Sequence, residues 1–455
     1  MNQQGVRWTA EQVLDLAPDA ASRKAGGRLG ASGPWSGTGC SGEGVVWGLC
    51  KGSGSTPYRT VVDTAGPAYK CSCPSRKFPC KHALGLLLLW AADEGTVPTG
   101  GDAPDWAEQW LEGRRAQEAE KAKASGGSGG GSAAPADAEA ARRRAANRAA
   151  RVTAGAEELE QRLADLLRGG LAAAEQAGYG LWEETARRMV DAQAPGLAGR
   201  VRELGAIPGS GPGWPVRLLE ESALTHLLDR AWLSVDRLPG PLAATVRTRV
   251  GIPVPAEGPA VRDRWLVLAQ YDTPDNKLTA RRIWLYGQAT GRTALLLSFG
   301  AAGRAPQLAL PVGAVLDAEV TPYPGAGRLR AELGRRYAAP VASDTPPPGG
   351  TAGDALTAYG LALQEDPWLD TWPVTVGDVI PVPAEGGGWQ LSDADGASAL
   401  PLTHTATSGP GLWRLASVSG GAPVTVFGEC GHRGFTPLAV WPHDAADTPG
   451  PVALT

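Results

Sequence analysis

Three cysteines and one histidine lie within twelve residues of the chain, and their types and spacing are those of a metal-binding site. Cys71, Cys73, Cys80 and His82 form the pattern C-x-C-x6-C-x-H, which supplies three thiolates and one imidazole. Such a set completes the tetrahedral coordination that Zn²⁺ prefers in proteins. With four protein ligands, no coordination position stays open for water or substrate. The pattern therefore predicts one structural zinc ion.

Two short arms can bring these ligands together. Side chains two residues apart on an extended strand point to the same face, so an extended Cys71–Cys73 segment would aim both thiols at one centre. A hydrophobic run from Ala83 to Trp90 follows His82 directly and predicts a helix that packs over the metal. The alternative is a set of buried structural thiols or a disulfide pair. Cysteines separated by one residue bridge poorly, and the rest of the chain has cytosolic features, which favours zinc.

The order of the four ligands and the hydrophobic helix after them resemble the SWIM zinc finger, a module of bacterial helicase-associated proteins, plant transposases and a eukaryotic kinase. The segment 46–55, followed by Pro57 and Tyr58, is similar to bacterial members that carry this finger. The resemblance implies that the zinc module binds DNA or protein partners, and it implies no catalytic activity. For bacterial relatives it further implies work with MoxR-type AAA+ ATPases and von Willebrand A-domain proteins.

Length and composition bound the class of protein. A chain of 455 residues is long enough for about two to four domains. Its net charge of −4 creates no global field that would draw it to nucleic acid, so such binding must use a local patch. Residues 1–7 are polar and lack the apolar core of a signal peptide, and the longest apolar stretch, 84–92, is too short to span a bilayer. These features predict a cytoplasmic protein without membrane association.

Shifts in composition divide the chain into four parts. Residues 1–123 are predicted to form the zinc-finger domain, with strands and helices at 45–50, 57–63, 68–73, 80–94 and 105–123. The Gly/Ser-rich stretch 124–136 predicts a flexible linker. Leucines recur at helical spacing in 137–250, and aromatic and branched residues favour strands in 251–455, for example at 265–271, 282–288 and 292–299. The predicted fold class is α+β, with a helical middle region and a β-rich C-terminal half.

Basic residues surround the predicted metal site and form a candidate nucleic-acid-binding surface. Between residues 51 and 82, Asp63 is the one acid, and Tyr58, Tyr69 and Phe78 interleave with the cations. Cations with aromatic rings on a rigid knuckle suit phosphate contact and base stacking. The competing interpretation is that these charges only solvate the finger and offset the negative charge of a three-thiolate zinc centre. The six basic residues are Lys51, Arg59, Lys70, Arg76, Lys77 and Lys81.

Two functions of the finger therefore stay open, contact with nucleic acid (DNA above all) and contact with a protein partner. Cys50, just upstream, is predicted to be a buried thiol on a strand and not a ligand. Cys430 and His432 repeat the C-x-H half of the motif, but a second metal site needs two more donors, and only His404, His443 and scattered carboxylates lie nearby.

The chain has no phosphate-binding loop, no H-E-x-x-H and no dinucleotide fingerprint after a strand. It is predicted to be a non-enzymatic adaptor.

Overall fold

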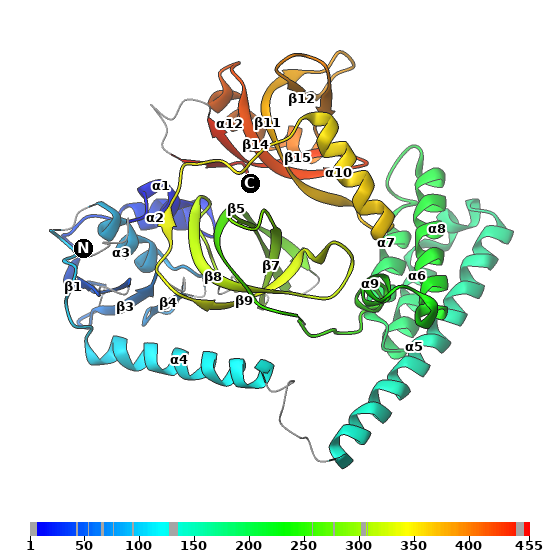
Figure 1. The fold of residues 1–455 in the computed structure, drawn as a ribbon, viewed down its shortest axis with the longest axis horizontal. Coiled ribbons are helices and arrows are strands. Elements are labelled where there is room, and N and C mark those ends of the chain that lie inside the picture. The colour runs from blue at the N-terminus through cyan, green and yellow to red at the C-terminus, as the bar shows by residue number, and fades with distance from the viewer. Residues whose placement is uncertain are drawn as a thin grey trace.

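The computed structural model describes residues 7–41, 44–52, 54–64, 68–75, 77–92, 95–126, 135–256, 258–275, 278–301, 306, 308–442 and 450–455. The predicted α+β class is confirmed: a small N-terminal sheet with its helices, a helical middle region and two further sheets follow one another along the chain (Figure 1). Among the described residues, no helix combines the length and the apolar character that crossing a membrane requires.

The N-terminal head is a four-stranded antiparallel sheet covered by helices. Its elements are α1 (Ala10–Asp15), α2 (Ala20–Gly27), β1 (Trp35–Cys40), β2 (Val45–Cys50), β3 (Tyr58–Asp63), β4 (Ala68–Cys71) and α3 (Lys81–Ala92), with the strands in chain order. Thr9 caps α1 in a capping box with Gln12. Residues 82–90 of α3 are all buried. Gly85 lets α3 approach the chain at Leu29, because a Cβ at Gly85 would lie 2.5 Å from the Leu29 Cβ.

A long helix leaves this head. The first half of α4 (Asp105–Gly126) packs on β2 and β3 through Ala107 and Leu111, with Trp106 and Trp110 partly buried against the same cluster. Those two tryptophans, one helical turn apart in the sequence, explain why this half of the helix docks. The predicted flexible linker 124–136 falls mainly on residues 127–134, which lie outside the described residues; the residues on either side of that gap are helical.

The middle region is a helical bundle. It contains α5 (Pro135–Gly169), α6 (Ala172–Asp191), α7 (Pro195–Ala206), α8 (Trp214–Leu233), the short 3₁₀ helix η1 (Val235–Arg237) and α9 (Gly240–Val250). Its core holds Leu159, Leu163, Trp182, Met189 and Trp232. The leucine spacing correctly predicted helices here. Leu159, Leu163, Leu218 and Leu228 lie in the core, whereas Leu167, Leu219 and Leu227 are exposed.

The second sheet closes into a five-stranded barrel. Its strands are β5 (Val261–Asp275), β6 (Leu278–Gly287), β7 (Thr293–Ala301), β8 (Ala314–Pro322) and β9 (Arg330–Arg336). They pair in the order β5-β6-β7-β9-β8, and β8 returns to β5; only the β7–β9 pair is parallel. The short 3₁₀ helix η2 (Ala326–Arg328) precedes β9, and β10 (Val341–Ala342) adds to the edge of β8. This closed order is that of an OB-fold barrel, whose usual ligand surface is the outer face of its second and third strands.

One buried carboxylate fixes a turn of the barrel. Asp263 on β5 is 6% exposed and accepts hydrogen bonds from the backbone N–H of Arg264, Ala289 and Thr290 and from the Thr290 hydroxyl. Burial raises the pKa of Asp263, but these hydrogen bonds outweigh it, and the net pKa is lowered. The connection between β6 and β7 is thereby held to β5.

The third sheet lies over the barrel. It runs β13 (Ala399–Pro401), β12 (Trp389–Asp393), β11 (Thr371–Pro383), β14 (Val424–Gly431), β15 (Gly434–Pro442) and β16 (Val452–Ala453). The helices that accompany it are α10 (Ala352–Glu365), α11 (His404–Ser408) and α12 (Pro410–Ser419).

The outer face of the first barrel strands is buried under this third sheet. Trp284 and Leu295 of the barrel share a core cluster with Phe427 and Trp441. Glu429 on β14 accepts hydrogen bonds from the Tyr271 hydroxyl at 2.6 Å and from Trp284 Nε1 at 2.9 Å, both on the barrel. The usual ligand surface of an OB-type barrel therefore serves here as an internal interface.

Two further contacts join the helical bundle and the N-terminal head to the two C-terminal sheets. Figure 1 shows the barrel between the N-terminal head and the bundle. Arg249 of α9 forms a bidentate ion pair with Asp366, which follows α10 and is 6% exposed. On the other side, Gln12 Nε2 donates to the Val312 carbonyl at 3.4 Å, and Ala309 enters the core of the head.

Candidate metal centre

The four predicted ligands converge. The sulfur atoms of Cys71, Cys73 and Cys80 and a ring nitrogen of His82 all lie within 4.8 Å of one another. Bond lengths of about 2.3 Å to sulfur and about 2.0 Å to nitrogen place the ligand atoms of a tetrahedral zinc site roughly 3.5–3.8 Å apart. The Cys71 Sγ to His82 Nδ1 distance is 3.7 Å. The cluster therefore fits one zinc ion.

The first arm is a strand end, and here the predicted boundary was wrong. The sequence predicts a strand through Cys73, but β4 ends at Cys71. The hairpin nevertheless holds one residue further: the Ser72 N–H donates to the Arg59 carbonyl and the Ser72 hydroxyl accepts from the Arg59 N–H, each at 3.0 Å. One backbone and one side-chain hydrogen bond thus continue the pairing past the strand end and position Cys73 beside the other ligands.

The second arm is the start of a buried helix. The carbonyl of Cys80 accepts from the Leu84 N–H at 3.0 Å, so Cys80 stands at the entrance of α3 and His82 lies in its first turn. The partial positive charge of a helix N-terminus favours thiolate over thiol at such a position. Because α3 is buried over nine consecutive residues (82–90), the position of this arm is set by the core of the head.

The imidazole is held by packing. His82 is 5% exposed, and the Tyr58 ring lies against it with a centroid distance of 4.8 Å and an interplanar angle of 36°. This contact leaves Nδ1 facing the sulfur atoms. The Thr60 hydroxyl lies 3.3 Å from the Cys71 sulfur, a neutral partner for that thiolate.

The three sulfurs cannot all ionise without a cation between them. A hydrogen bond from Cys80 lowers the pKa of Cys71 to about 4, whereas the same contact raises the pKa of Cys80. Burial raises the pKa of Cys73. A divalent cation would supply the charge that turns all three into thiolates, so metal binding at this site releases protons. The donor set and its electrostatics point to the same ion.

Other candidate ligands stay apart. Cys50 is buried on β2, and its Sγ contacts the Lys51 carbonyl at 3.9 Å; burial raises the pKa of this thiol. Cys430 is buried, whereas His432 is exposed and its Nδ1 lies 3.3 Å from the Tyr359 hydroxyl. Over the described part of the chain, the cluster of Cys71, Cys73, Cys80 and His82 is the one group of three or more metal-binding side chains that comes together. His443 lies outside the described residues.

The basic residues around the finger divide into three kinds. Lys77 forms an ion pair with Asp19 at 2.6 Å, and this contact lowers the pKa of Asp19 to about 2. Arg76 lies outside the described residues. The remaining four are exposed and have no described carboxylate within ion-pair distance: Lys51, Arg59, Lys70 and Lys81.

Two of the three aromatic rings near these cations are used inside the molecule. Tyr58 packs on His82, and the Tyr69 hydroxyl is buried without a hydrogen-bond partner in the described part of the chain. Burial raises the pKa of Tyr69, with Arg281 of the barrel acting in the opposite direction. Tyr69 packs against the core of the head, a cluster that includes Ala309, and is therefore no platform for stacking bases.

Comparison with known proteins identifies two regions. Residues 58–91, from β3 to α3, match the SWIM zinc finger, and these residues include all four ligands. Residues 147–250, from within α5 to α9, match the SWIM-associated four-helix bundle domain, which the leucine spacing alone did not identify. No curated protein and no solved structure matches the chain. The chain thus carries a SWIM zinc finger domain together with the four-helix bundle domain associated with that finger.

Proposed function

We propose that the chain is a non-enzymatic adaptor whose SWIM finger, held by one structural zinc ion, binds duplex DNA. The zinc ion would be bound by Cys71, Cys73, Cys80 and His82, which leaves no coordination position for catalysis. The observation that carries the DNA proposal is the four exposed cations beside a rigid metal knuckle. Lys51, Arg59 and Lys70 lie on or next to strands, and Lys81 opens α3.

Phosphate contact is favoured over base reading. With Tyr58 and Tyr69 used in packing, the finger offers cations more than stacking surfaces. Contacts of this kind fix a protein on the duplex without specifying sequence. The proposed binding is therefore strongly salt-dependent and weakly sequence-dependent.

Changing these four residues to glutamine should weaken duplex binding and flatten its dependence on salt. Each lost phosphate contact removes about 0.9 from the slope of log K against log salt, so the slope should fall by about 3–4. Fluorescence anisotropy with a labelled duplex at several salt concentrations measures both quantities. Zinc content, measured on the same sample, verifies that the finger is folded.

The matched control removes four exposed charges elsewhere. Arg142, Arg144, Arg151 and Arg168 of α5 are exposed, and their change to glutamine should leave the slope unaltered. Absence of duplex binding by the unaltered chain, or binding independent of salt, would contradict the proposal.

A second candidate function is protein interaction through the bundle. Val216, Leu219 and Leu227 of α8 are 62%, 48% and 44% exposed, and their spacing places them on one helix face. Exposed apolar side chains that gather on one face mark interaction surfaces more often than isolated ones do. The class of partner proposed from the resemblance is a MoxR-type AAA+ ATPase or a von Willebrand A-domain protein.

A Leu219→Glu, Leu227→Glu double variant should lose binding to such an ATPase, because two charges would be buried in the interface. Biolayer interferometry with increasing concentrations of the purified ATPase measures the loss of affinity. The control variant is Leu356→Glu, at a 51% exposed position of α10. Equal binding by the double variant and the control variant would exclude the α8 face.

A further inference from the structure

The outer side of the barrel carries a group of arginines, on β5, η2 and β9, that no function given so far uses. Residues 323–337 contain four arginines and one acid, in a chain whose net charge is −4. Arg262 and Arg264 on β5 lie beside them, since β8 pairs with both β5 and β9. We call the arginine face the exposed residues Arg262, Arg264, Arg328, Arg330 and Arg335 with Tyr323 and Tyr337.

Tyrosine rings lie among these guanidinium groups. The Cζ of Arg262 lies 3.7 Å from the ring centroid of Tyr337, and that of Arg335 lies 5.0 Å from the same centroid. The Cζ of Arg330 lies 4.5 Å from the centroid of Tyr323. A guanidinium stacked on a ring is pre-organised, because its planar fork keeps its N–H edges free for phosphate.

Two acids of β8 are already engaged, whereas Glu332, the one acid of β9, is exposed. Asp317 accepts a bidentate pair of hydrogen bonds from Arg262 at 2.9 and 2.7 Å, and Glu319 accepts a hydrogen bond from the Tyr337 hydroxyl. In the part of the chain that the structure describes, Arg264, Arg328, Arg330 and Arg335 have no carboxylate within ion-pair distance. The positive charge of the arginine face therefore remains available to a ligand.

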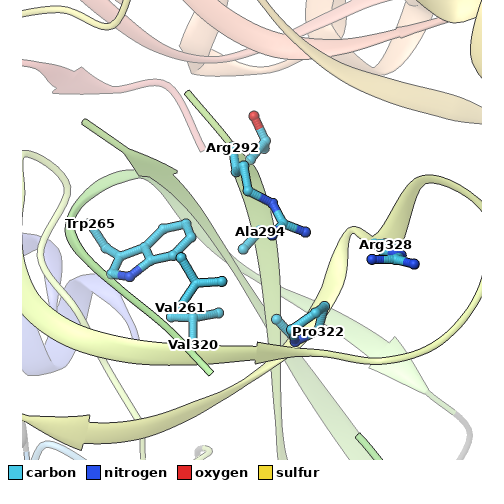
Figure 2. A pocket seen from close by; sticks show the side chains of 9 residues that line it. Val261, Trp265, Arg292, Ala294, Val320, Pro322 and Arg328 are labelled. Carbon is cyan, nitrogen blue, oxygen red and sulfur yellow. The ribbon is translucent and has the colours of Figure 1, made fainter. Parts of the chain in front are cut away.

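The arginine face lies on the open side of the barrel. The third sheet covers the first barrel strands at Trp284 and Leu295, whereas the arginines project from β9, its preceding segment and the first residues of β5. Figure 2 shows Arg292 and Arg328 at the rim of a small cavity at this end of the barrel. Its volume is about 10 Å³, which holds at most a single water molecule. A ligand must therefore lie across the surface and not inside the barrel.

We propose that the arginine face binds single-stranded nucleic acid. A single strand presents phosphates at regular intervals together with unpaired bases, and a surface on which cations alternate with aromatic rings recognises both. Arg264, Arg328, Arg330 and Arg335 hold phosphates, while Tyr337 and the guanidinium stacked on it receive a base. An acidic peptide would satisfy the charges but would bring no flat base to stack on the tyrosine and guanidinium pairs. This surface is separate from the finger, so the proposal does not depend on the duplex binding proposed above.

Binding of a labelled 20-residue oligothymidylate to the full chain tests this proposal. The Arg330→Gln, Arg335→Gln double variant should bind about tenfold more weakly, with a slope of log K against log salt reduced by about 1.4, since each single-strand contact contributes about 0.7. Tyr337→Leu should weaken binding about 5- to 100-fold at a nearly unchanged slope, because stacking carries little salt dependence. Tyr337→Phe, which keeps the ring, should restore most of the affinity.

Two comparisons separate this surface from the finger and from a general charge effect. The finger variant with four glutamines and the α5 control should both keep their affinity for oligothymidylate. Four results would each overturn the proposal: no binding by the unaltered chain, equal loss in the α5 control, loss in the finger variant alone, or displacement by polyglutamate as effective as by unlabelled oligothymidylate.

Discussion

A Cys80→Ser variant should lose its zinc ion and, with it, the fold of the N-terminal head. Cys80 is 2% exposed and belongs to the core of the head, so its sulfur cannot be replaced by a solvent ligand without opening that core. Metal binding in small zinc fingers supplies on the order of 10 kcal/mol of folding free energy. In the described part of segment 72–80, the other contacts reported above are the Ser72–Arg59 hydrogen bonds and the exposed Lys77–Asp19 ion pair, which stabilise much less than zinc binding. Elemental analysis and hydrogen exchange of α3 measure the two losses together.

The matched control is Cys50→Ala, a change of a buried thiol that is no member of the cluster. This variant should keep one equivalent of zinc and the slow exchange of α3. The barrel and the third sheet have their own cores and should remain folded in both variants. Retention of zinc by Cys80→Ser, or its loss from Cys50→Ala, would show that the ligand set is wrong.

The bundle should gain stability when Asp229 becomes asparagine. Asp229 on α8 is fully buried, and neither carboxylate oxygen has a hydrogen-bond partner in the described part of the chain. Burial raises its pKa to about 8; the Glu160 charge acts in the same direction and the Arg230 charge opposes it. In the folded protein at pH 7 the group is therefore mainly protonated.

The sign of the pH dependence follows from this raised pKa. At pH values below its usual pKa of 3.8, Asp229 is protonated in both the folded and the unfolded chain, and its raised pKa costs no folding free energy. Between that value and about 8, the unfolded chain releases the proton and the folded chain keeps it, so stability falls by about 1.4 kcal/mol per pH unit. Asparagine cannot ionise, so Asp229→Asn should raise the free energy of opening at pH 7 by roughly 4 kcal/mol.

Hydrogen exchange of α8 peptides, compared between the variant and the unaltered chain at each pH, measures this gain. The gain should shrink toward pH 4. Asp165→Asn, at a 74% exposed carboxylate of α5 that pairs with Arg168, should produce no comparable change. A constant difference across pH would mean that Asp229 does not titrate as its burial requires.

The metal ligands could be read from the sequence because they are local. All four lie within twelve residues, and the spacing itself determines that two short arms meet. The role of Tyr69 was also within reach: it lies next to exposed Lys70 on a strand, so alternation turns its ring to the opposite face. The end of β4 at Cys71 could not be predicted from the sequence, because it depends on how Ser72 bonds to Arg59.

The barrel shows the limit of sequence reasoning. Its strands at 265–271, 282–288 and 292–299 are visible as runs of aromatic and branched residues. The first lies within β5, and the other two overlap β6 and β7 with one residue outside each. Closure depends on the parallel pairing of Leu295 with Arg330, two residues far apart in the chain, which no local pattern encodes. The arginine face depends on two other long-range pairings, of β8 with β5 and of β8 with β9, which bring Arg262 and Arg335 to their shared neighbour Tyr337.

The docking of Ala309 and Val312 against the head has a consequence for biosynthesis. These residues leave the ribosome roughly 220 residues after Leu84, which at about 5–20 residues per second corresponds to about 10–45 seconds. Throughout that interval the nascent head must persist alone, with the side that will later meet the barrel still facing water. Early capture of the metal would therefore protect the growing chain, and metal starvation during translation should produce aggregates before the remaining domains are made.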